Sequence, residues 1–444
     1  PILRGLLAEP GEEPNSASRR MIMNWRFSPE VLDFCASTEA QQLCAQGPLT
    51  PDHVIRTKRL PLYIPDPLWA DEDALREQLK ESVRAYRQDY IRYFEKQCSE
   101  KKVVRAPLDS APRVVLLPGA GAFCFGPSQK DACIAGDITE HTLSTKAVAH
   151  AAGQYKALDE ADLFDMEYWS LEQAKLGKSV PRALDGQVVV ITGGAGAIGV
   201  GIAEACAQAG AQVVLADLAG DQAERAAQKL EQQHGAGRVL GLSMDVTREI
   251  SIREGFDRIC RKFGGIDVVV ANAGIAHVAP IEKLSVEDVR RVNEVNYVGV
   301  LLTIREAAGL FRSQGIGGNI IVNASKNVFA PGADFGAYSA SKAAAHQIGK
   351  VAAVELAPMG VRVNLINADA IFNEGEVESG LWKTIGPDRA RSRGLDVEAL
   401  PDFYQNRNLL KTRVQGRHVG NAVVFFASNQ TPTSGATLPV DGGI

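Results

Sequence analysis

Short apolar runs alternate with alanine-rich amphipathic stretches from about Leu184 to the end of the sequence. In order, the runs read VVVIT, QVVLAD, RVLGLSMDV, IDVVVANAG, NIIVNAS, VRVNLI and ATLPVDGG. Runs that are apolar along most of their length are typical of strands buried on both faces, and strands separated by helices pair in parallel. The pattern predicts an α/β fold, a doubly wound parallel sheet covered by helices on both faces.

The residues before this pattern have a different texture and are rich in proline near the start. Two helical patterns stand out there, one from Asp71 to about Gln97 and one from about Ser128 to His150. A chain of 444 residues exceeds the usual size of a single hydrophobic core, so two domains are expected. We place a smaller α/β domain at 1–180 and the larger domain at 184–444, with LGKSVPRALDG as the linker.

Composition limits the environment and the partners. The net charge of −5 comes from 48 basic and 53 acidic residues that are well interspersed, which leaves no basic stripe for nucleic acid. Seven cysteines without a CxxC pair indicate reduced thiols rather than disulfides or a zinc site. No segment reaches the roughly 18 apolar residues of a membrane span, and the first residues do not resemble a signal peptide. We expect a soluble cytoplasmic protein that binds neither nucleic acid nor membrane.

Two glycine-rich stretches could each hold a nucleotide, RVVLLPGAGAFCFG at 113–126 and VVVITGGAGAIG at 188–199. A dinucleotide needs a strand, a tight turn, a helix N-terminus and an acid at the end of the next strand. Only the second stretch meets all of these conditions, because Asp217 ends QVVLAD 18 residues beyond the last glycine. The candidate cofactor contacts in this stretch are Gly193, Gly196, Ile198 and Gly199.

The carboxylate of Asp217 would accept hydrogen bonds from a ribose diol and repel a 2′-phosphate, which favours NAD over NADP. The first stretch has no such acid after it. We interpret it as a strand, a glycine-rich turn and a helix within a packed α/β layer.

A further set of residues indicates an enzyme. NIIVNAS ends at Ser325, and AYSASKAAAH carries Tyr338 and Lys342 four residues apart, on one face of a helix. A phenol titrates near about 10, but an adjacent ammonium stabilises the phenolate and lowers its pKa, so Tyr338 could act as a base. Ser325 would hydrogen-bond the substrate oxygen as charge develops on it. The spacing of Tyr338 and Lys342 alone would mean little, and the ordered combination carries the prediction.

These motifs resemble, in order, those of the short-chain dehydrogenase/reductase family over about residues 184–444. The matching segments are TGGAGAIG, the acid at 217, NAG at 272–274, VNYVG, the serine at 325 and YSASK. The resemblance implies a Rossmann fold and a homo-dimer or homo-tetramer. It also implies a catalytic tetrad of Ser325, Tyr338, Lys342 and Asn296. In this tetrad Tyr338 is the acid/base, Lys342 also holds the nicotinamide ribose, and Asn296 supports a proton-relay water. The resemblance also implies four further cofactor contacts, Asp245 beside the adenine, Val246, Asn272 and Gly274.

Two departures from the family pattern bear on cofactor affinity. Ala197 takes the place of the middle glycine of TGxxxGxG and adds a methyl group where backbone approaches the pyrophosphate. Asn367-Ala368-Asp369-Ala370 replaces the Pro-Gly that follows the sixth strand, which removes the usual backbone contacts to the nicotinamide amide. Two further residues, His277 and Trp382, are candidates either for the lining of a substrate pocket or for plain packing.

The first part of the chain is similar to the middle of bacterial fusion proteins that join a class II aldolase of the rhamnulose-phosphate type to a short-chain dehydrogenase. The similarity rests on PILRGLLAEPGEEP, GPLTPDHVIRTKRLPLYI and LFDMEYWSLEQAKLG. Those aldolases hold zinc with a closely spaced histidine pair, whereas His53, His141 and His150 are isolated here. We therefore expect an aldolase-like remnant domain, with no metal site and no lyase activity, that serves as a structural or docking domain.

Together these features predict an NAD-dependent oxidoreductase that moves a hydride between nicotinamide and a hydroxyl-bearing carbon. The substrate class would be a small sugar-derived alcohol or a hydroxyaldehyde such as lactaldehyde, which the resemblance to the rhamnose-related fusions implies. An aldehyde would react as its hydrate, because no cysteine falls in the inferred site to form a thiohemiacetal. The alternative from another class is a non-catalytic dinucleotide-binding module that acts as a sensor or scaffold.

Overall fold

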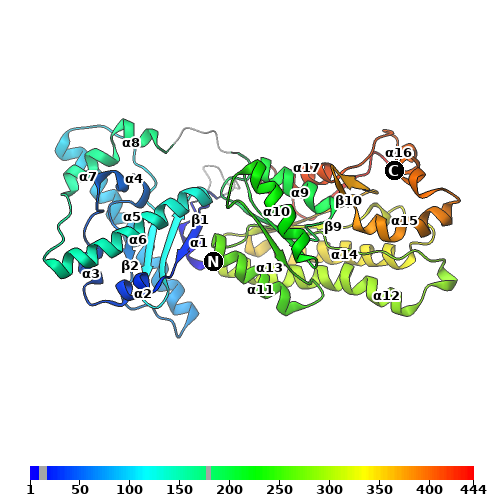
Figure 1. Ribbon diagram of the computed structural model, residues 1–444, viewed down its shortest axis with the longest axis horizontal. Coiled ribbons are helices and arrows are strands. Elements are labelled where there is room, and N and C mark those ends of the chain that lie inside the picture. Colours follow the sequence, from blue (N-terminus) through cyan, green and yellow to red (C-terminus); the bar gives the residue numbers. More distant parts are fainter. Residues whose placement is uncertain (10–17, 177–181) are drawn as a thin grey trace. The chain divides into compact units, whose positions relative to one another are not determined.

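The computed structural model describes residues 1–9, 18–176 and 182–444. The chain divides into two compact units, one formed mainly by the chain up to Pro181 and the other mainly by the chain from Arg182 onward. Figure 1 draws both units.

The first unit is built on a four-stranded sheet with the order β1–β4–β3–β2. The strands are β1 (Ile22–Arg26), β2 (Leu62–Tyr63), β3 (Val114–Leu117) and β4 (Gly121–Gly126). Side chains alternate along β3 because successive residues of a strand point to opposite faces. Val114 and Leu116 join a buried cluster with Leu143 of α6 (Gln129–Ala152). Val115 and Leu117 join another cluster on the side of α5 (Glu72–Lys101).

The two long helices of this unit begin where the sequence predicted. Asp71 caps α5, because its side chain accepts hydrogen bonds from the backbone N–H groups of Asp73 and Ala74. Ser128 caps α6 in the same way, accepting from the N–H of Asp131.

The stretch 113–126 forms a β-hairpin, and the expectation of a strand followed by a turn and a helix is wrong in its middle part. β3 and β4 pair antiparallel, so the segment GAFCFG is itself a strand and the helix begins only after it. Gly119 has φ +79° and Gly121 has φ +90°, conformations that favour glycine. A Cβ atom at Gly121 would also lie 2.4 Å from the carbonyl oxygen of Arg26. These glycines serve a tight hairpin turn.

The second unit contains a seven-stranded, all-parallel sheet, as predicted, and each of the seven apolar runs contributes a strand. The strand order is β13–β10–β9–β8–β5–β6–β7. The strands are β5 (Val188–Thr192), β6 (Gln212–Asp217), β7 (Val239–Ser243), β8 (Val268–Ala271), β9 (Gly318–Asn323), β10 (Val361–Ala368) and β13 (Thr437–Val440). The chain order reverses between β5 and β8. In sheets of this kind, a crevice opens at the carboxyl ends of the strands at that point.

Helices cover both faces of this sheet (Figure 1). One buried cluster joins the strands to α9 (Ala197–Gln208), α10 (Gly220–His234) and α17 (Gly416–Ala427). On the other face, α13 (Gly299–Gln314) and α14 (Gly336–Glu355) contact the central strands. A Cβ atom at Gly201 would lie 2.2 Å from the carbonyl carbon of Gly416, so glycine permits the close contact between α9 and α17.

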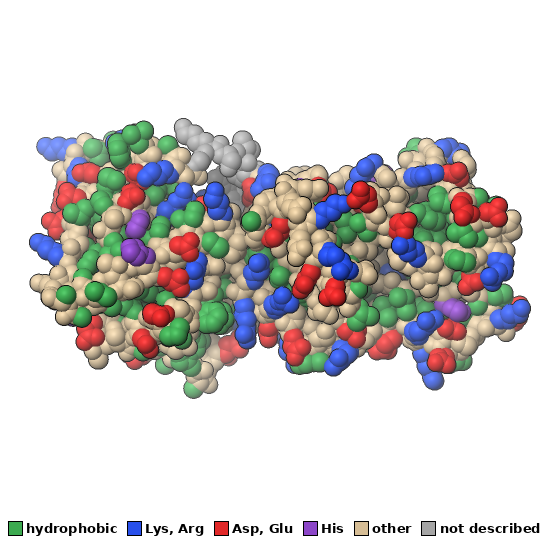
Figure 2. All heavy atoms as spheres, viewed as in Figure 1, with side chains coloured by type: hydrophobic (Ala, Val, Ile, Leu, Met, Phe, Trp, Pro, Cys, Tyr) green, Lys and Arg blue, Asp and Glu red, His purple; other side chains and the backbone are tan. Residues whose placement is uncertain are grey.

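The visible surface carries mixed charge. Figure 2 shows basic and acidic side chains interspersed over both units. Among the helices in the described ranges, none is long and apolar enough to cross a membrane.

Candidate functional site

A cavity of about 500 Å³ opens at the carboxyl ends of β5, β6 and β8, where the strand order reverses. It is lined by three kinds of segment: the glycine turn after β5, the ends of β6 to β9, and α14 with the segment after β10. The predicted residues that line it are Gly193, Gly196, Ile198, Gly199, Asp217, Asp245, Val246, Asn272, Gly274, Tyr338 and Lys342.

The glycine turn is shaped by close backbone contacts. Gly193 has φ +62°, and a Cβ atom there would lie 2.8 Å from Cα of Ala273. A Cβ atom at Gly199 would lie 2.5 Å from the carbonyl oxygen of Gly193, so neither position has room for a side chain. Gly196 differs, because the nearest atom to its Cβ position is the Gly193 oxygen at 3.6 Å. Gly196 is also the N-cap of α9 and has no side chain to cap the helix.

Asp217 is tied to the glycine turn at the end of β6. One carboxylate oxygen accepts from the N–H of Ala195 at 3.0 Å, and the other accepts from the N–H of Ala219 at 3.0 Å. Each oxygen keeps a further lone pair for a ligand hydroxyl. Asp245, in the turn after β7, accepts from the backbone N–H of Thr247 at 2.9 Å and from its hydroxyl at 2.7 Å.

Asn272, which follows β8, is hydrogen-bonded to the ends of the neighbouring strands β5 and β9. Its side-chain amide donates to the carbonyl oxygens of Thr192 at 2.9 Å and Gly193 at 3.1 Å, while its oxygen accepts from Asn323 at 2.8 Å. Gly274 leaves space for the lysine, because a Cβ atom there would lie 3.2 Å from Nζ of Lys342. The NAG motif therefore fixes the turn and opens room for the ammonium group.

These residues fit a nicotinamide dinucleotide. The turn offers backbone at a helix N-terminus for phosphates, Asp217 offers a carboxylate for ribose hydroxyls, and the cavity has the volume of a ligand site. Gly193, Gly196 and Gly199 would hold the pyrophosphate, and Lys342 with Tyr338 would lie at the nicotinamide end.

Ser325 follows the carboxyl end of β9, and Tyr338 and Lys342 line the larger cavity beside it. Tyr338 and Lys342 lie in the first two turns of α14, and Ser325 precedes a short 3₁₀ turn, where its hydroxyl accepts from the N–H of Asn327 at 3.1 Å. The Lys342 ammonium donates to the carbonyl oxygen of Asn323 at 2.9 Å. The side chains of Ser325 and Lys342 are both buried.

The pKa values of the pair are governed by burial. Burial raises the pKa of Tyr338 above its ordinary value, and a hydrogen bond from the Ser325 hydroxyl partly offsets the rise. The net direction is opposite to the predicted lowering, because desolvation outweighs the other influences on the phenol. Burial also lowers the pKa of Lys342, to about 8.

Asn296 lies in a π-helical turn, Glu294–Val298, a feature that often marks functional sites. Its side-chain oxygen accepts from the N–H of Ile275 at 2.8 Å. Its amide donates to the carbonyl oxygen of Ile275 at 2.8 Å and to the Ser341 hydroxyl at 3.0 Å. The Asn296 side chain thus joins the NAG turn to α14.

A second cavity of about 90 Å³ adjoins the first and shares Tyr338 with it. Ser325 and Trp382 line it, which places Trp382 in the pocket that the sequence suggested. His277 is not among the lining residues of either cavity and lies 3.5 Å from Asp288.

The lining of this second cavity includes charged residues that sequence reasoning did not assign, Lys326, Asp369, Arg389 and Arg407. Asp369 was noticed only as a departure from the Pro-Gly pattern. The arginines fall in stretches without a recognised motif, so only the fold brings them together. Among the described residues that line the two cavities, there is no cysteine.

Ala197, the departure in the glycine turn, has little exposed surface. It is 2% exposed and belongs to the buried cluster that α9 forms with the sheet. The carbonyl oxygen of Ala197 would lie 2.4 Å from a Cβ atom at Gly416, so glycine in α17 accommodates this turn. Ala197 also lines the larger cavity, so an altered cofactor affinity stays a prediction.

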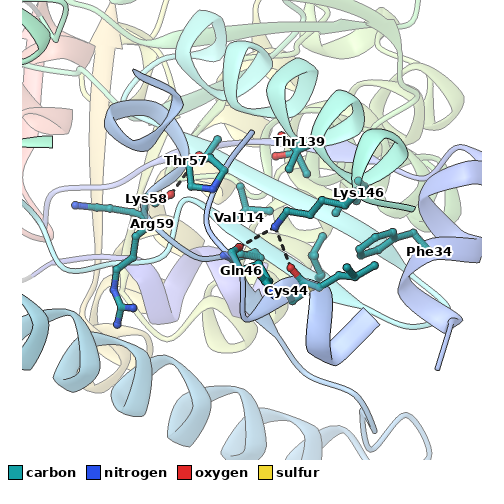
Figure 3. Close-up of a pocket in the computed structure, with 15 residues that line it drawn as sticks. Phe34, Cys44, Gln46, Thr57, Lys58, Arg59, Val114, Thr139 and Lys146 are labelled. Atoms are coloured by element: carbon teal, nitrogen blue, oxygen red, sulfur yellow. Dashed lines mark hydrogen bonds between the residues drawn. The ribbon is translucent and has the colours of Figure 1, made fainter. Parts of the chain in front are cut away.

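The first unit has a small cavity of its own, of about 30 Å³ (Figure 3). The Lys146 ammonium donates to the carbonyl oxygens of Leu43 at 2.9 Å and Gln46 at 2.7 Å, which Figure 3 marks with dashed lines. Burial lowers the pKa of Lys146 to about 8. Within 1–9, 18–176 and 182–444, no group of three His, Cys, Asp or Glu side chains is placed to hold a metal ion.

Comparison with known proteins identifies both parts of the chain. The family described as aldolase class II, second domain, matches residues 1–176, and the family described as short chain dehydrogenase matches residues 187–380. The uncharacterized oxidoreductase YuxG of Bacillus subtilis is 32% identical over 447 residues, which is 100% of this chain and 63% of that protein. The chain therefore spans less than two thirds of the length of that relative.

Two better-defined relatives match only the second part of the chain. L-2,3-butanediol dehydrogenase of Corynebacterium glutamicum is 32% identical over 260 residues, 58% of this chain and 98% of that enzyme. The crystal structure of sorbitol-6-phosphate 2-dehydrogenase from Erwinia amylovora superposes with a TM-score of 0.53 and 30% identity, over 57% of this chain and 98% of that one. The resemblance predicted from the motifs is thereby confirmed. The chain belongs to the short-chain dehydrogenase/reductase family, whose enzymes use a nicotinamide dinucleotide, and it carries an aldolase class II second domain ahead of the dehydrogenase part.

Proposed function

We propose that this enzyme is an NAD-dependent oxidoreductase acting on a hydroxyl-bearing carbon of a small sugar-derived alcohol or hydroxyaldehyde. The observation that carries the proposal is the position of Tyr338, which lines both the larger cavity, suited to a dinucleotide, and the smaller one beside it. A general base must lie within hydrogen-bond reach of the substrate hydroxyl, and the carbon bearing that hydroxyl must lie beside the nicotinamide, so a phenol at the junction of the two cavities is suitably placed.

Tyr338 takes the hydroxyl proton of the substrate, and Ser325 donates a hydrogen bond to the oxygen on which negative charge develops. Lys342 adds positive charge at the same end of the cavity and orients the cofactor. The dinucleotide, when bound, accepts the hydride from the carbon. Since burial raises the pKa of Tyr338, the oxidation rate should rise with pH as more of the phenol becomes the phenolate base.

Asn296 acts in this proposal as a positioning residue. Its side chain bridges the turn at Ile275 and the hydroxyl of Ser341, next to Lys342 in sequence, so it holds the nicotinamide end of the cavity against α14. Any relay of protons would run through water placed by this frame.

The preference for NAD is inferred from Asp217. Its carboxylate lines the cavity at the end of β6, where a 2′-phosphate would meet a negative charge.

The substrate class is supported by the relatives. Two of them are named for polyols or their phosphates, D-threitol dehydrogenase of Mycolicibacterium smegmatis, 33% identical, and sorbitol-6-phosphate 2-dehydrogenase of Escherichia coli, 28% identical.

An assembly of two or four copies is also part of the proposal. α14 is alanine-rich, and two of its side chains, Val351 and Val354, are 38% and 76% exposed. Exposed apolar residues on a helix of small side chains suit close packing against a second copy.

The function is tested with Tyr338→Phe. We expect turnover of polyols and lactaldehyde with NAD to fall about 100- to 10,000-fold, because the proton acceptor is lost, while NAD affinity changes little. The measurements are steady-state kinetics and NAD titration of both proteins. Binding of NAD without turnover in the native protein, across the whole panel, would instead support a non-catalytic sensor.

A further inference from the structure

The second cavity carries an excess of positive charge. Three cations, Lys326, Arg389 and Arg407, line it together with a single carboxylate, that of Asp369. Arg407 is ion-paired with Asp369. The remaining charge lies beside Ser325 and Tyr338, the residues placed above at the reacting hydroxyl.

Of these cations, Arg389 in α15 (Gly380–Arg393) is the strongest argument for a bound anion, because it is only 1% exposed. Its Nε donates to the Tyr404 hydroxyl at 3.1 Å, and one terminal nitrogen donates to the carbonyl oxygen of Ala333 at 2.7 Å. The guanidinium also lies 4.6 Å from the centre of the Phe335 ring. Among the residues that the structure describes, no carboxylate pairs with it. Burying a guanidinium against neutral partners is costly unless an anion completes the site.

The neighbouring cations reinforce this need for an anion. Nε of Arg407, in α16 (Leu400–Arg407), is buried and has no hydrogen-bond partner. Lys326 donates to the carbonyl oxygen of Ala330 at 3.0 Å, and burial and the nearby arginines lower its pKa. The cations thus repel one another as well as losing solvent.

The cavity of the first unit provides a contrast within the same chain. It also has basic lining residues, but protein groups satisfy each of them. Lys146 is held by two carbonyl oxygens, Arg59 pairs with Asp89 and Glu160, and Lys58 lies 3.5 Å from Glu167. Two of these three cations thus have a carboxylate beside them, whereas Arg389 has only a hydroxyl and a carbonyl oxygen as acceptors and no carboxylate among the described residues.

We propose that the second cavity is an anion subsite and that the substrate is a small hydroxyl-bearing anion, whose phosphate or carboxylate is held by Arg389 with support from Lys326 and Arg407. This inference rests on the proposed function, because it names the class of substrate that the same site oxidises. A planar guanidinium recognises either anion through paired N–H donors. The volume of about 90 Å³, well below that of a typical ligand pocket, suits a short carbon chain bearing one such group.

The test compares matched substrates with the full chain and NAD. Lactate is paired with propane-1,2-diol, and glycerol 3-phosphate with glycerol, so the two arms separate carboxylate from phosphate. We expect kcat/KM to be about 10- to 100-fold higher for the anionic member of at least one pair. In Arg389→Met, KM for that anion should rise by a similar factor and the preference should vanish. Arg391→Met, an exposed arginine in the same helix, should keep it.

A binding measurement keeps the proposal testable if turnover is low or if Arg389→Met folds poorly. Inorganic phosphate and lactate are titrated calorimetrically into the NAD complexes of three proteins: the native protein, Arg389→Lys and Lys326→Met. Arg389→Lys keeps the positive charge but loses the paired N–H donors of the guanidinium. Weaker anion binding in both variants supports the subsite. Oxidation of neutral alcohols with no anion preference and no anion binding would overturn the inference and leave the proposed function standing. Anion binding that depends on Arg389, without oxidation of any alcohol, would overturn the proposed function instead.

Discussion

Burial moves the pKa values of Tyr338 and Lys342 in opposite directions for one reason. Removing a group from water disfavours its charged form, so the pKa of Tyr338 rises and the pKa of Lys342 falls to about 8. The sequence places the two residues one helical turn apart, and it contains no information on how much solvent reaches them. This is why the predicted acidification of the phenol by Lys342 is not met, although both residues line the expected cavity.

The buried ammonium should make stability depend on pH. Lys342 titrates at about 8 when folded and at its ordinary 10.5 when unfolded, so between these values the unfolded chain holds a proton that the folded chain has released. Stability therefore rises with pH across this window, and the full cost of the buried charge is present below about pH 8. That cost is of the order of 3 kcal/mol.

Lys342→Met removes this cost. We expect the variant to resist urea better than the native protein at pH 7, and the advantage to shrink as the pH approaches 10.5. Urea unfolding curves at pH 7 and pH 10 measure the difference. Lys383→Met, whose side chain is 66% exposed, is the control and should show no such trend. An equal advantage at both pH values would contradict the assignment.

The negative charge of Asp217 should set the choice between the two dinucleotides. Asp217→Asn keeps the shape and one oxygen that can accept from Ala195, but it removes the charge that would repel a 2′-phosphate. We expect the ratio of kcat/KM for NAD to that for NADP to fall about 10- to 100-fold. Kinetics with both dinucleotides measure it, with Asp221→Asn, a neighbouring exposed aspartate, as the control. An unchanged ratio would remove Asp217 from cofactor selection.

At the scale of the element, the turn between β5 and α9 contains glycines with different duties. Gly193 combines a positive φ with a Cβ position 2.8 Å from Cα of Ala273, whereas Gly196 has φ −76° and no atom nearer than 3.6 Å. Gly193→Ala should destabilise the protein by at least about 1 to 2 kcal/mol from conformation alone. Gly196→Ala should fold normally but bind NAD more weakly, because its methyl group enters the cavity where backbone nears the ligand. Thermal unfolding and NAD titration of both variants separate the two effects. Equal melting temperatures would contradict the role given to Gly193, and unchanged NAD affinity in Gly196→Ala would contradict the role given to Gly196.

The seven strands of the parallel sheet were predictable because each lies in a mostly apolar run and amphipathic helices separate these runs. The hairpin of β3 and β4 was not, since its turn glycines look the same in sequence as those of a nucleotide loop. Whether the segment after the turn forms a strand depends on the strands available to pair with it. β4 pairs antiparallel with β3 and also with β1, which comes from much earlier in the chain. The charged lining of the second cavity escaped prediction for the same reason, because Lys326, Arg389 and Arg407 come from three separate elements.

At the scale of the whole molecule, every residue assigned to the dinucleotide and substrate cavities belongs to the second unit. The first unit depends on a buried pair of its own. Glu167 is fully buried, accepts from the Tyr90 hydroxyl at 2.8 Å and lies 3.5 Å from Lys58, whose pKa burial lowers to about 8. Removing one member of such a pair leaves the other charge buried without a partner, which destabilises the folded state.

Glu167→Leu should therefore destabilise the first unit by about 3 to 5 kcal/mol, and adding Lys58→Met should restore much of that loss. Because Glu167 touches neither cavity of the second unit, kcat/KM for the dehydrogenase reaction should stay within about twofold of the native value at temperatures below unfolding. Calorimetry of the full chain and activity after stepwise heating provide the measurements, with Glu160→Leu, a half-exposed acid of the same unit, as the control. If Glu167→Leu lowers the temperatures of unfolding and of activity loss together, the two units unfold as one, and the expectation that the second unit keeps its activity independently of the first is wrong.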